Sequence, residues 1–423
     1  MFFTFLSRTE MRGAFVEEMI SSRKTTLLLV ALALLGVMPE ETVGQTSRSL
    51  TDRAQASILT ILPGDATYSA FGHTAIRIRD PAAGVNRIYN YGTFDFRNPL
   101  FIPRFVYGRL DYFLSIATYP RAIRRYRELR RPVIEQKLRL TLAQRRALFR
   151  YLETNALPEN RFYRYDFLFD NCSTRIRDAL EAVLGDTLRF PASRMPPTDS
   201  FRHMLDPYVA DRAWLDFGFD LALGTPADRT ATPREAMFLP RYLMRAFDEA
   251  ALRSGGSLVA ERDTVFWVEG RSFAPQAAFP WAQLVGWLLL AASLIDAAWR
   301  LRTGRPFPDR TDAALFGAVG IVSLLMLFLW LVSEHRVTNR NWNLIWAWPA
   351  HLWAAWRLAR GPSLGLRRYL VLAAVGALAV SVLWPFWPQD LHAAALPLVL
   401  LVAVRSGARW LALHRAARER LLA

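Results

Sequence analysis

The 423-residue sequence contains a single cysteine, Cys172, and only six histidines. One cysteine excludes an intramolecular disulfide in any compartment, so the lone thiol needs another explanation. The histidines and the cysteine do not have the spacing of metal ligands, and there is no glycine-rich nucleotide-binding loop. Internal repeats and low-complexity tracts are also missing from the sequence. We therefore expect no metal and no nucleotide cofactor, and repeat architectures are excluded.

Apolar residues make up 52% of the chain, with 14 Trp and 27 Phe, which exceeds ordinary soluble usage. They are concentrated beyond residue 280, so a lipid-embedded region is expected there. The net charge of +16 comes almost entirely from arginine, and much of it flanks the apolar segments. This placement favours anionic membrane phospholipid as the partner of the basic residues and argues against nucleic-acid binding.

Residues 1–44 have the pattern of a secretory signal. Arg23 and Lys24 precede an apolar stretch over 25–37, which has the length of a signal h-region and is short for a membrane span. Small residues near Gly44 offer a cleavage point, and both cleavage and retention of this segment stay open. Export of the residues that follow is expected.

Five apolar runs predict about five transmembrane helices between residues 280 and 408. They cover 281–299, 313–332, 344–356, 369–387 and 391–404. Arginines follow the first, third and fifth runs, whereas the loops after the second and fourth are far less basic. By the positive-inside rule, the arginine-rich loops and a basic tail, 409–423, face the cytoplasm. The preceding domain then lies on the periplasmic or extracellular face of the cytoplasmic (inner) membrane.

Residues 45–275 have ordinary globular composition and predict one exported α+β domain. Alternation of apolar and polar residues over 73–79 and 87–91, with a turn at 80–84, predicts an antiparallel hairpin. The apolar spacing over 141–152 predicts a helix instead.

Cys172 follows Asp170 and Asn171 at the predicted start of an amphipathic helix. There the macrodipole and the free backbone N–H groups favour a thiolate and can donate to an oxyanion, which favours a nucleophile over the alternative of a small core residue. A thiol nucleophile needs a base within reach. His73, at the head of a predicted strand, is the candidate, with a hydrogen-bonded strand-edge histidine as the alternative. His203 lies in a proline-rich segment and is predicted to be structural.

Three blocks, at residues 71–78, 89–96 and 169–178, resemble the domain found in the Lnb family of bacterial lipoprotein N-acyltransferases. In this order they span most of the predicted exported domain. A histidine on an early strand followed by Asn-Cys at a helix start is more distantly similar to the circularly permuted papain-like (NlpC/P60-type) enzymes, including lecithin:retinol acyltransferases. The resemblance implies a permuted papain-like α+β domain, followed here by a helical membrane bundle.

The resemblance also implies an activity. An acyl chain would move from the diacylglyceryl group of a bacterial lipoprotein to the amine of its N-terminal cysteine, through a thioester on the enzyme. The family's thiol and imidazole correspond to Cys172 and His73. The third, orienting residue is implied to be Asn90, with Asp95 as second choice and Asn171 as a further candidate. The implied partners are diacylglyceryl-modified lipoproteins, and no cofactor is required.

Two further features concern access to lipid. An arginine-rich run at 121–131 suits anionic head groups, or alternatively forms a solvated helix face. The polar loop 335–343 lies between two predicted spans, before a tryptophan-rich segment. Some Lnb-like proteins have a similar loop, which implies substrate contacts from its polar residues, His335, Asn339, Asn341 and Asn343. The alternative is an interfacial tryptophan belt with ordinary loop asparagines.

Two rival functions stay open. A cysteine peptidase or amidase acting on cell-wall peptides uses the same thiol and imidazole, although such a hydrolase rarely needs five spans. A non-catalytic membrane protein for lipid binding or assembly would keep Cys172 buried and inert. The small number of charged residues within the apolar runs argues against ion transport.

Overall fold

The structure is a computed structural model, in which the described residues are 49–94, 99–109, 111–191, 194–195, 197–270, 278–361 and 363–422. The predicted signal segment, 1–44, and Asp95 lie outside these residues. Residues 50–423 belong to one compact unit, which contains a globular α+β domain followed by a helical region.

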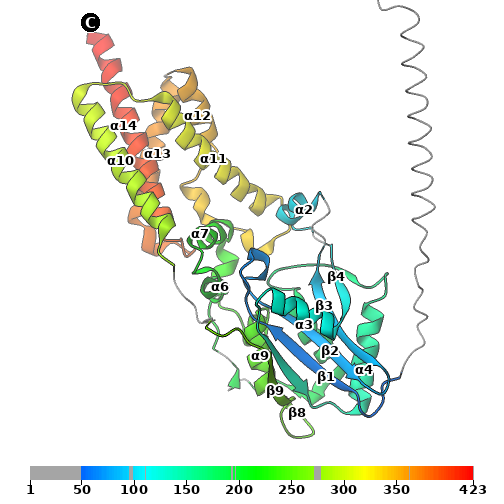
Figure 1. Ribbon diagram of the computed structural model, residues 1–423. Coiled ribbons are helices and arrows are strands. Elements are labelled where there is room, and N and C mark those ends of the chain that lie inside the picture. Colours follow the sequence, from blue (N-terminus) through cyan, green and yellow to red (C-terminus); the bar gives the residue numbers. More distant parts are fainter. Residues whose placement is uncertain are drawn as a thin grey trace, which may run out of the picture. The chain divides into compact units, whose positions relative to one another are not determined.

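Seven strands of the globular domain form one antiparallel sheet, in the spatial order β6-β4-β3-β2-β1-β5-β9 (Figure 1). The strands are β1 (Gln55–Ile61), β2 (His73–Asp80), β3 (Val85–Thr93), β4 (Asp111–Thr118), β5 (Val133–Leu138), β6 (Phe162–Arg164) and β9 (Val259–Phe266). A second, two-stranded ladder joins β7 (Leu188–Arg189) to β8 (Ala251–Leu252). The hairpin predicted from alternation is confirmed, because β2 pairs with β3 with Ile76 opposite Tyr89.

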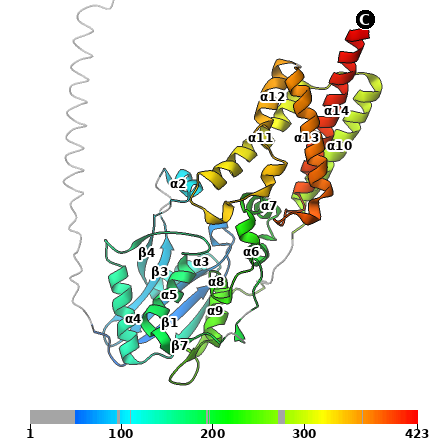
Figure 2. The ribbon, with the colours of Figure 1, turned by 180° about the vertical axis from the view of Figure 1, so that it is seen from behind.

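Helices cover both faces of this sheet. On one face pack α4 (Leu142–Asn155), α5 (Cys172–Leu184) and α9 (Pro240–Glu249), and on the other lies α3 (Tyr119–Glu128) (Figures 1 and 2). The two faces follow from strand alternation: Ile76 and Ile78 of β2 point to the α5 side, whereas Ala75 points to the α3 side. The predicted helix at 141–152 is confirmed as α4, which begins at a capping box formed by Thr141 and Gln144.

Shorter helices complete the domain around a second apolar cluster that includes Phe201, Phe238 and Leu239. They are α6 (Phe201–Val209) and α8 (Pro233–Ala236). Two further short helices lie outside this cluster: α2 (Phe101–Tyr107), which has no buried residue, and α7 (Ala213–Ala222), whose Phe217 packs with the membrane helices. His203 lies in α6, so the proline-rich segment ends before it and a helix begins with Ser200 as its cap.

Four helices of the described chain are long and apolar enough to cross a membrane: α10 (Trp281–Thr303), α11 (Asp309–Leu331), α13 (Leu364–Val382) and the Ala395–Glu419 part of α14 (Ala395–Leu422) (Figure 2). Their outward side chains are apolar and unusually exposed, as at Ile295 (72%) and Val382 (75%). Such surfaces need lipid as their solvent. The membrane region is confirmed, but the prediction of about five helices is wrong by one.

The third predicted span, 344–356, does not form a continuous helix. The chain makes the 3₁₀ helix η6 (Trp342–Ile345) and then, after Pro349, the ten-residue helix α12 (His351–Arg360). Proline lacks the backbone N–H that a helix interior requires, so α12 begins only beyond it. Ten helical residues reach about 15 Å, which is roughly half of the hydrocarbon thickness. The apolar composition of this run indicated membrane but not a complete helix.

Helix α12 nevertheless runs back along α11. Leu352 lies against Gly320, where an added Cβ would be 2.7 Å from the leucine side chain and 2.8 Å from its backbone nitrogen. Ala355, one turn later, lies against Gly317, so the two helices are antiparallel. The small glycines permit this close packing, which is a common device between membrane helices. The segment after α11 thereby returns the chain to the end of the bundle at which α11 began.

Two arginines of α14 are buried in an ion-pair cluster at this end. Arg405 lies 2.6 Å from Asp296 of α10 and 2.5 Å from Asp312 of α11, and Arg409 lies 3.2 Å from Asp312. Helix α14 also continues to Leu422, so the segment predicted as a tail from residue 409 is helical through Leu422. A buried charge is tolerated when it is paired in this way, and the cluster ties three helices together.

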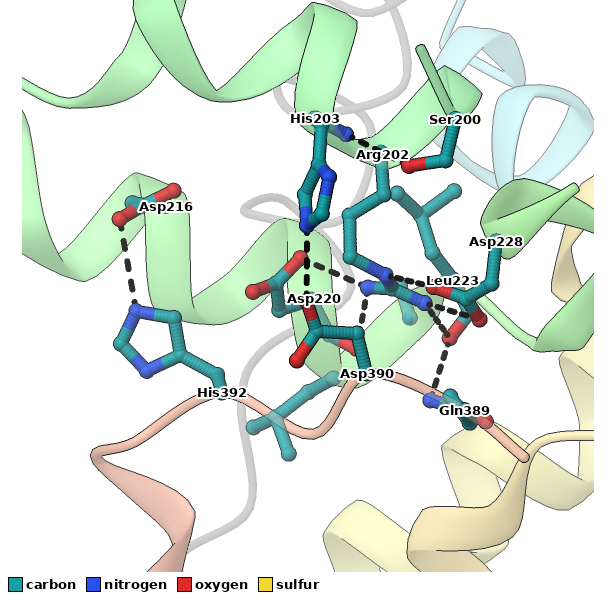
Figure 3. A network of polar contacts seen from close by, with 12 residues as sticks. Ser200, Arg202, His203, Asp216, Asp220, Leu223, Asp228, Gln389, Asp390 and His392 are labelled. Atoms are coloured by element: carbon teal, nitrogen blue, oxygen red, sulfur yellow. Dashed lines mark hydrogen bonds and ion pairs between the residues drawn. The ribbon is translucent and has the colours of Figure 1, made fainter. Parts of the chain in front are cut away.

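A polar network joins the globular domain to the segment between α13 and α14 (Figure 3). His203 of α6 bonds Asp390 at 2.9 Å, and His392 bonds Asp216 of α7 at 3.4 Å. Beside them, the amide of Gln389 donates to the carbonyl of Leu223. This supports the predicted structural role of His203, since its imidazole bridges two parts of the chain 187 residues apart.

The same network carries a pH prediction. The Asp390 hydrogen bond raises the pKa of His203, and burial together with Asp220 and Asp216 raises the pKa of Asp206 to about 7. Groups with raised pKa values bind more protons in the folded state, so each stabilises this junction at low pH and loses its contribution as the pH rises through its folded pKa. We expect amide hydrogen exchange in α6, corrected for intrinsic rates, to be at least about threefold faster at pH 8 than at pH 6.

Asp206→Asn is the matched control for this prediction, because it removes one titrating group without changing its size. The variant should flatten the pH dependence. Equal corrected exchange at the two pH values in the unmodified protein would contradict the prediction.

Candidate functional site

The N-terminus of α5 is built by Asn171. Its side-chain Oδ1 accepts from the backbone N–H groups of Ser173 (2.8 Å) and Thr174 (3.0 Å), and the Thr174 hydroxyl accepts from the N–H of Asn171. The Asn171 amide also donates to the carbonyls of Phe167 and Phe238. Asparagine is a preferred N-cap because its short side chain reaches these free amides. Cys172 is therefore held as the first residue of the helix, as the sequence predicts.

His73 and Asn90 lie on neighbouring strands. His73 is the first residue of β2, and its Nε2 is 3.4 Å from Oδ1 of Asn90 on β3. Because the amide oxygen can only accept, this contact assigns the proton to Nε2 and leaves Nδ1 as an acceptor. Continuing the β2/β3 register places both side chains on one face of the sheet. The predicted pairing of these two residues is therefore present.

The thiol of Cys172 lies near the start of β2 and the end of β3, where His73 and Asn90 also lie. The hydroxyls of Thr74 and Ser173, the residues after His73 and Cys172, are 3.0 Å apart. On β3, a Cβ added to Gly92 would be 3.5 Å from Cβ of Cys172. Gly92 has φ +82°, and the β3/β4 register shifts between Asn90 and Thr93. A bulge with a glycine in the left-handed region bends the strand locally, which leaves room for the cysteine.

The imidazole of His73 and the thiol of Cys172 are both neutral at physiological pH. Burial, followed by the charge of Arg131, lowers the pKa of His73 to about 4. Burial also raises the pKa of the Cys172 thiol, although backbone hydrogen bonds from Thr74 and Ser173 act in the opposite direction. The expectation of a thiolate from the helix N-terminus alone is therefore not met. Loss of water around the sulfur outweighs the helix terminus, and the resting pair is a protonated thiol beside a neutral imidazole.

Arg131 belongs in the sequence to the arginine-rich run at 121–131, but in the structure it is buried, and its charge acts on His73 and Cys172. Its Nε donates to the carbonyl of Leu62 at 3.0 Å, and it is only 6% exposed. The arginines of α3, such as Arg124 and Arg127, are exposed instead. No local pattern distinguishes Arg131 from its neighbours, because its burial depends on where the chain after α3 enters β5.

Few donors at the helix start remain for an oxyanion. Asn171 already takes the N–H groups of Ser173 and Thr174, which leaves the N–H of Cys172 itself. The Tyr163 hydroxyl is a second donor. It is buried, no described residue accepts its proton, and it lies 3.8 Å from the Cβ position over Gly92, whose backbone N–H points toward it. A buried hydroxyl whose proton has no acceptor costs free energy, so its position next to the thiol points to use by a ligand.

The loop at 335–343 has other partners. His335 Nε2 lies 2.7 Å from the carbonyl oxygen of Phe105 in α2, and Asn341 donates to the carbonyl of Leu221 in α7. The Oδ1 of Asn343 accepts from the indole of Trp346. The backbone of Asn339 leaves no space for a Cβ at Gly224. None of these contacts involves Cys172 or His73. The loop joins the globular domain to the membrane helices, and the substrate contacts expected of its polar residues stay a prediction.

A row of aromatic rings leads from the thiol to α2. Tyr165, which borders the space over Gly92 together with Cys172, stacks on Tyr112 with ring centres 4.1 Å apart. The row continues through Phe94, Phe101 and Phe105 at centre separations of 5.1, 5.5 and 6.4 Å. No residue of α2 is buried, and Tyr107 contacts Phe328 near the end of α11. The aromatic row thus connects the site to the exposed helix α2, next to the end of α11.

The described residues contain no group of three or more His, Cys, Asp or Glu side chains that could hold a metal ion. The chemistry available at this site is that of a thiol, an imidazole and hydrogen-bond donors.

The helix cap can be tested separately from the chemistry. We expect Asn171→Ala to destabilise the folded protein by about 2 kcal/mol, because it removes the cap and leaves two buried carbonyls without donors. Thr141→Ala, at the exposed capping box of α4, is the matched control, with a loss of about 1 kcal/mol. Thermal unfolding of the full-length protein in detergent measures both. A smaller loss for Asn171→Ala than for Thr141→Ala would contradict the buried role of Asn171.

Comparison with known proteins agrees with these features. Residues 44–206 match the Lnb N-terminal periplasmic domain, and residues 276–416 match the Lnb transmembrane domain. No curated protein and no solved structure matches the chain. The two matched regions occur in the order of the α+β domain and the membrane helices described above. The chain therefore belongs to the Lnb family, with a periplasmic domain joined to a transmembrane domain and a role in lipoprotein processing.

Proposed function

We propose that this protein is a thiol-dependent acyltransferase that moves an acyl chain from the diacylglyceryl group of a bacterial lipoprotein to the amine of its N-terminal cysteine. The observation that carries the proposal is the position of Cys172 at a helix start, beside the His73–Asn90 pair, with the aromatic row leading from it to α2. A thiol, a base and an apolar approach from the membrane are what acyl transfer from a lipid ester requires.

In the first half-reaction, Sγ of Cys172 attacks the ester carbonyl carbon while Nδ1 of His73 takes the thiol proton. The resulting oxyanion accepts hydrogen bonds from the N–H of Cys172 and the hydroxyl of Tyr163. Collapse breaks the bond between the carbonyl carbon and the glyceryl oxygen, and the imidazolium gives its proton to that oxygen. The products are a thioester on Cys172 and a lipoprotein with one chain fewer on its glyceryl group.

In the second half-reaction, the neutral N-terminal amine of the lipoprotein attacks the thioester carbon. His73 takes one amine proton, the C–S bond breaks, and the proton returns to the sulfur. An amide forms and the thiol is regenerated, so no cofactor is consumed. Asn90 holds the Nε2 tautomer throughout, so that Nδ1 remains the proton acceptor. A permuted papain-like arrangement of the domain would account for this order of histidine strand, orienting residue and helix-borne cysteine.

The topology supports placing this chemistry at the outer face of the cytoplasmic membrane. Arginines such as Arg302, Arg357 and Arg367 gather at the end of the bundle where α10, α12 and α14 end and α11 and α13 begin. The positive-inside rule then assigns that end, and the C-terminus, to the cytoplasm. The globular domain attaches at the opposite end, through the loop at 335–343.

Mass spectrometry of lipoprotein N-termini tests the proposal. Cells depleted of the protein should accumulate lipoproteins with two glyceryl-linked chains and a free amine, and complementation should restore N-acylated lipoproteins with one glyceryl-linked chain. An unchanged acylation pattern after complete depletion would overturn the proposal. Altered cell-wall peptides with unchanged lipoproteins would indicate a peptidase or amidase instead.

Tyr163→Phe tests the second oxyanion donor. Loss of one such donor costs about 100- to 1,000-fold in kcat, so we expect a decrease of that order with little change in KM. Thermal stability should change by less than about 1 kcal/mol, because the hydroxyl donates to no described residue and only the nearby N–H of Gly92 would lose an acceptor. Tyr91→Phe, whose ring lies 6.2 Å from that of Tyr163, is the matched control and should retain activity within about threefold. Wild-type kcat in Tyr163→Phe would remove Tyr163 from the mechanism.

A further inference from the structure

A cavity of about 480 Å³ lies between α13 and α14, away from the thiol. Its lining residues are Leu364, Arg367, Arg368, Val371, Leu372, Trp410 and His414. They come from the first turns of α13 and the second half of α14, so the cavity is at the arginine-rich end of the bundle. Its volume is in the range of sites that bind small ligands.

The cavity carries positive charge without a counter-ion among the described residues. Arg367 and Arg368 form no ion pair with any described carboxylate, whereas Arg405 and Arg409 of the neighbouring cluster are each paired with aspartates. The N-terminus of α13, capped by Ser363, adds the positive end of a 19-residue helix. The arginines that lie beside the cavity therefore differ from the buried ones in lacking a partner.

Apart from His414, the remainder of the lining is apolar. Leu364 is 56% exposed and Leu372 is 62% exposed, and both continue the outward surface of α13. On the opposite wall, the rings of Trp410 and His414 stack with centres 5.3 Å apart. Tryptophan favours the membrane–water interface, so Trp410 indicates that the cavity lies between the lipid chains and the water. A ligand of this cavity must therefore combine an anionic group with an apolar body.

We propose that this cavity binds the head group of an anionic phospholipid, with Arg367 and Arg368 on the phosphate and the acyl chains along Leu364 and Leu372. The ligand is supplied by the surrounding leaflet, and basic sites between membrane helices are suited to it. This lipid is distinct from the substrate, because the cavity is at the opposite end of the helices from the globular domain. The inference does not depend on the proposed acyl transfer.

Native mass spectrometry of the full-length protein, released from vesicles of equal parts phosphatidylglycerol and phosphatidylcholine, tests the proposal. The unmodified protein should retain phosphatidylglycerol in preference to phosphatidylcholine. Each arginine near a phosphate contributes roughly fivefold, so the Arg367→Ala/Arg368→Ala double variant should lower retention of phosphatidylglycerol by roughly 30-fold. Arg302→Ala, an exposed arginine at the same end that does not line the cavity, is the matched control.

Three results would overturn the proposal. Equal retention of the two lipids would remove the charge selectivity. An equal loss in the double variant and in Arg302→Ala would indicate attraction to the whole arginine-rich end and not to this cavity. Displacement of phosphatidylglycerol by about 10 mM glycerol 3-phosphate would indicate a site for the phosphate group alone, since a lipid held by its chains as well resists a soluble head group.

Discussion

Cys172→Ser is expected to lower the rate of lipoprotein N-acylation by at least about 1,000-fold, with Cys172→Ala at least as severe. In the proposed mechanism the sulfur forms the thioester, and loss of a nucleophile that acts together with its base removes most of the chemical rate enhancement. The rate is measured with purified full-length protein and a diacylglyceryl-modified lipopeptide in detergent, by mass spectrometry of the N-acylated product.

The chain offers an internal control for this experiment, because Cys172 is its only cysteine. A thiol-reactive probe should label the unmodified protein once and the serine variant not at all, and a trapped thioester should add one acyl mass to the unmodified protein alone. The thermal unfolding temperature of Cys172→Ser should stay within a few degrees of the unmodified protein, since the two side chains are similar in size. A serine variant that retains full activity would exclude the thioester mechanism.

His73→Ala is expected to reduce kcat/KM by about 100- to 10,000-fold, the range that a positioned general base contributes. The base must be neutral to accept the thiol proton, and burial lowers the pKa of His73 to about 4. The acidic limb of the pH profile in the unmodified protein should therefore fall near pH 4, with activity rising as the pH increases through it. The variant should lack this limb.

Alkylation of the thiol gives an independent measurement of the same pair. Because burial raises the pKa of Cys172 above its ordinary value of 9.0, the alkylation rate should still be increasing at pH 9. An alkylation rate that reaches a plateau below pH 7 would show a preformed thiolate and contradict the protonated thiol. An activity profile with its acidic limb near the ordinary histidine pKa would contradict the buried, neutral imidazole of His73.

Local patterns predicted the elements that carry the site. The alternation of apolar and polar residues before and after Asp80 indicated the hairpin of β2 and β3. The polar residues around Asn171 indicated the start of α5, with Cys172 as its first residue. These features depend on interactions between residues close in the sequence, such as strand alternation and helix capping, so one sequence contains them. The selection of Asn90 came from the family resemblance, and the contact with His73 agrees with it.

The roles of several other residues depend on packing between distant segments. Arg131 and Tyr163 lie near the thiol only because the sheet brings strands from different parts of the chain together. His335 and Asn341 have the residue types of a binding loop, yet their hydrogen bonds go to backbone carbonyls of α2 and α7. Polar residues in a loop satisfy whichever buried groups are nearest, and sequence alone does not identify those groups.

The sequence by itself determined that the chain joins a globular α+β domain to lipid-embedded helices. It also determined which thiol and which imidazole are candidates for the chemistry. Both follow from composition and short-range periodicity, which are properties of the chain. Only the tertiary structure decided that the third predicted span, 344–356, is interrupted at Pro349 and continues as the ten-residue helix α12. Hydropathy measures affinity for lipid and does not measure helix continuity. The tertiary structure also decided that the thiol is protonated at rest, because burial is set by everything packed around Cys172 and outweighs the helix end on which the sulfur lies.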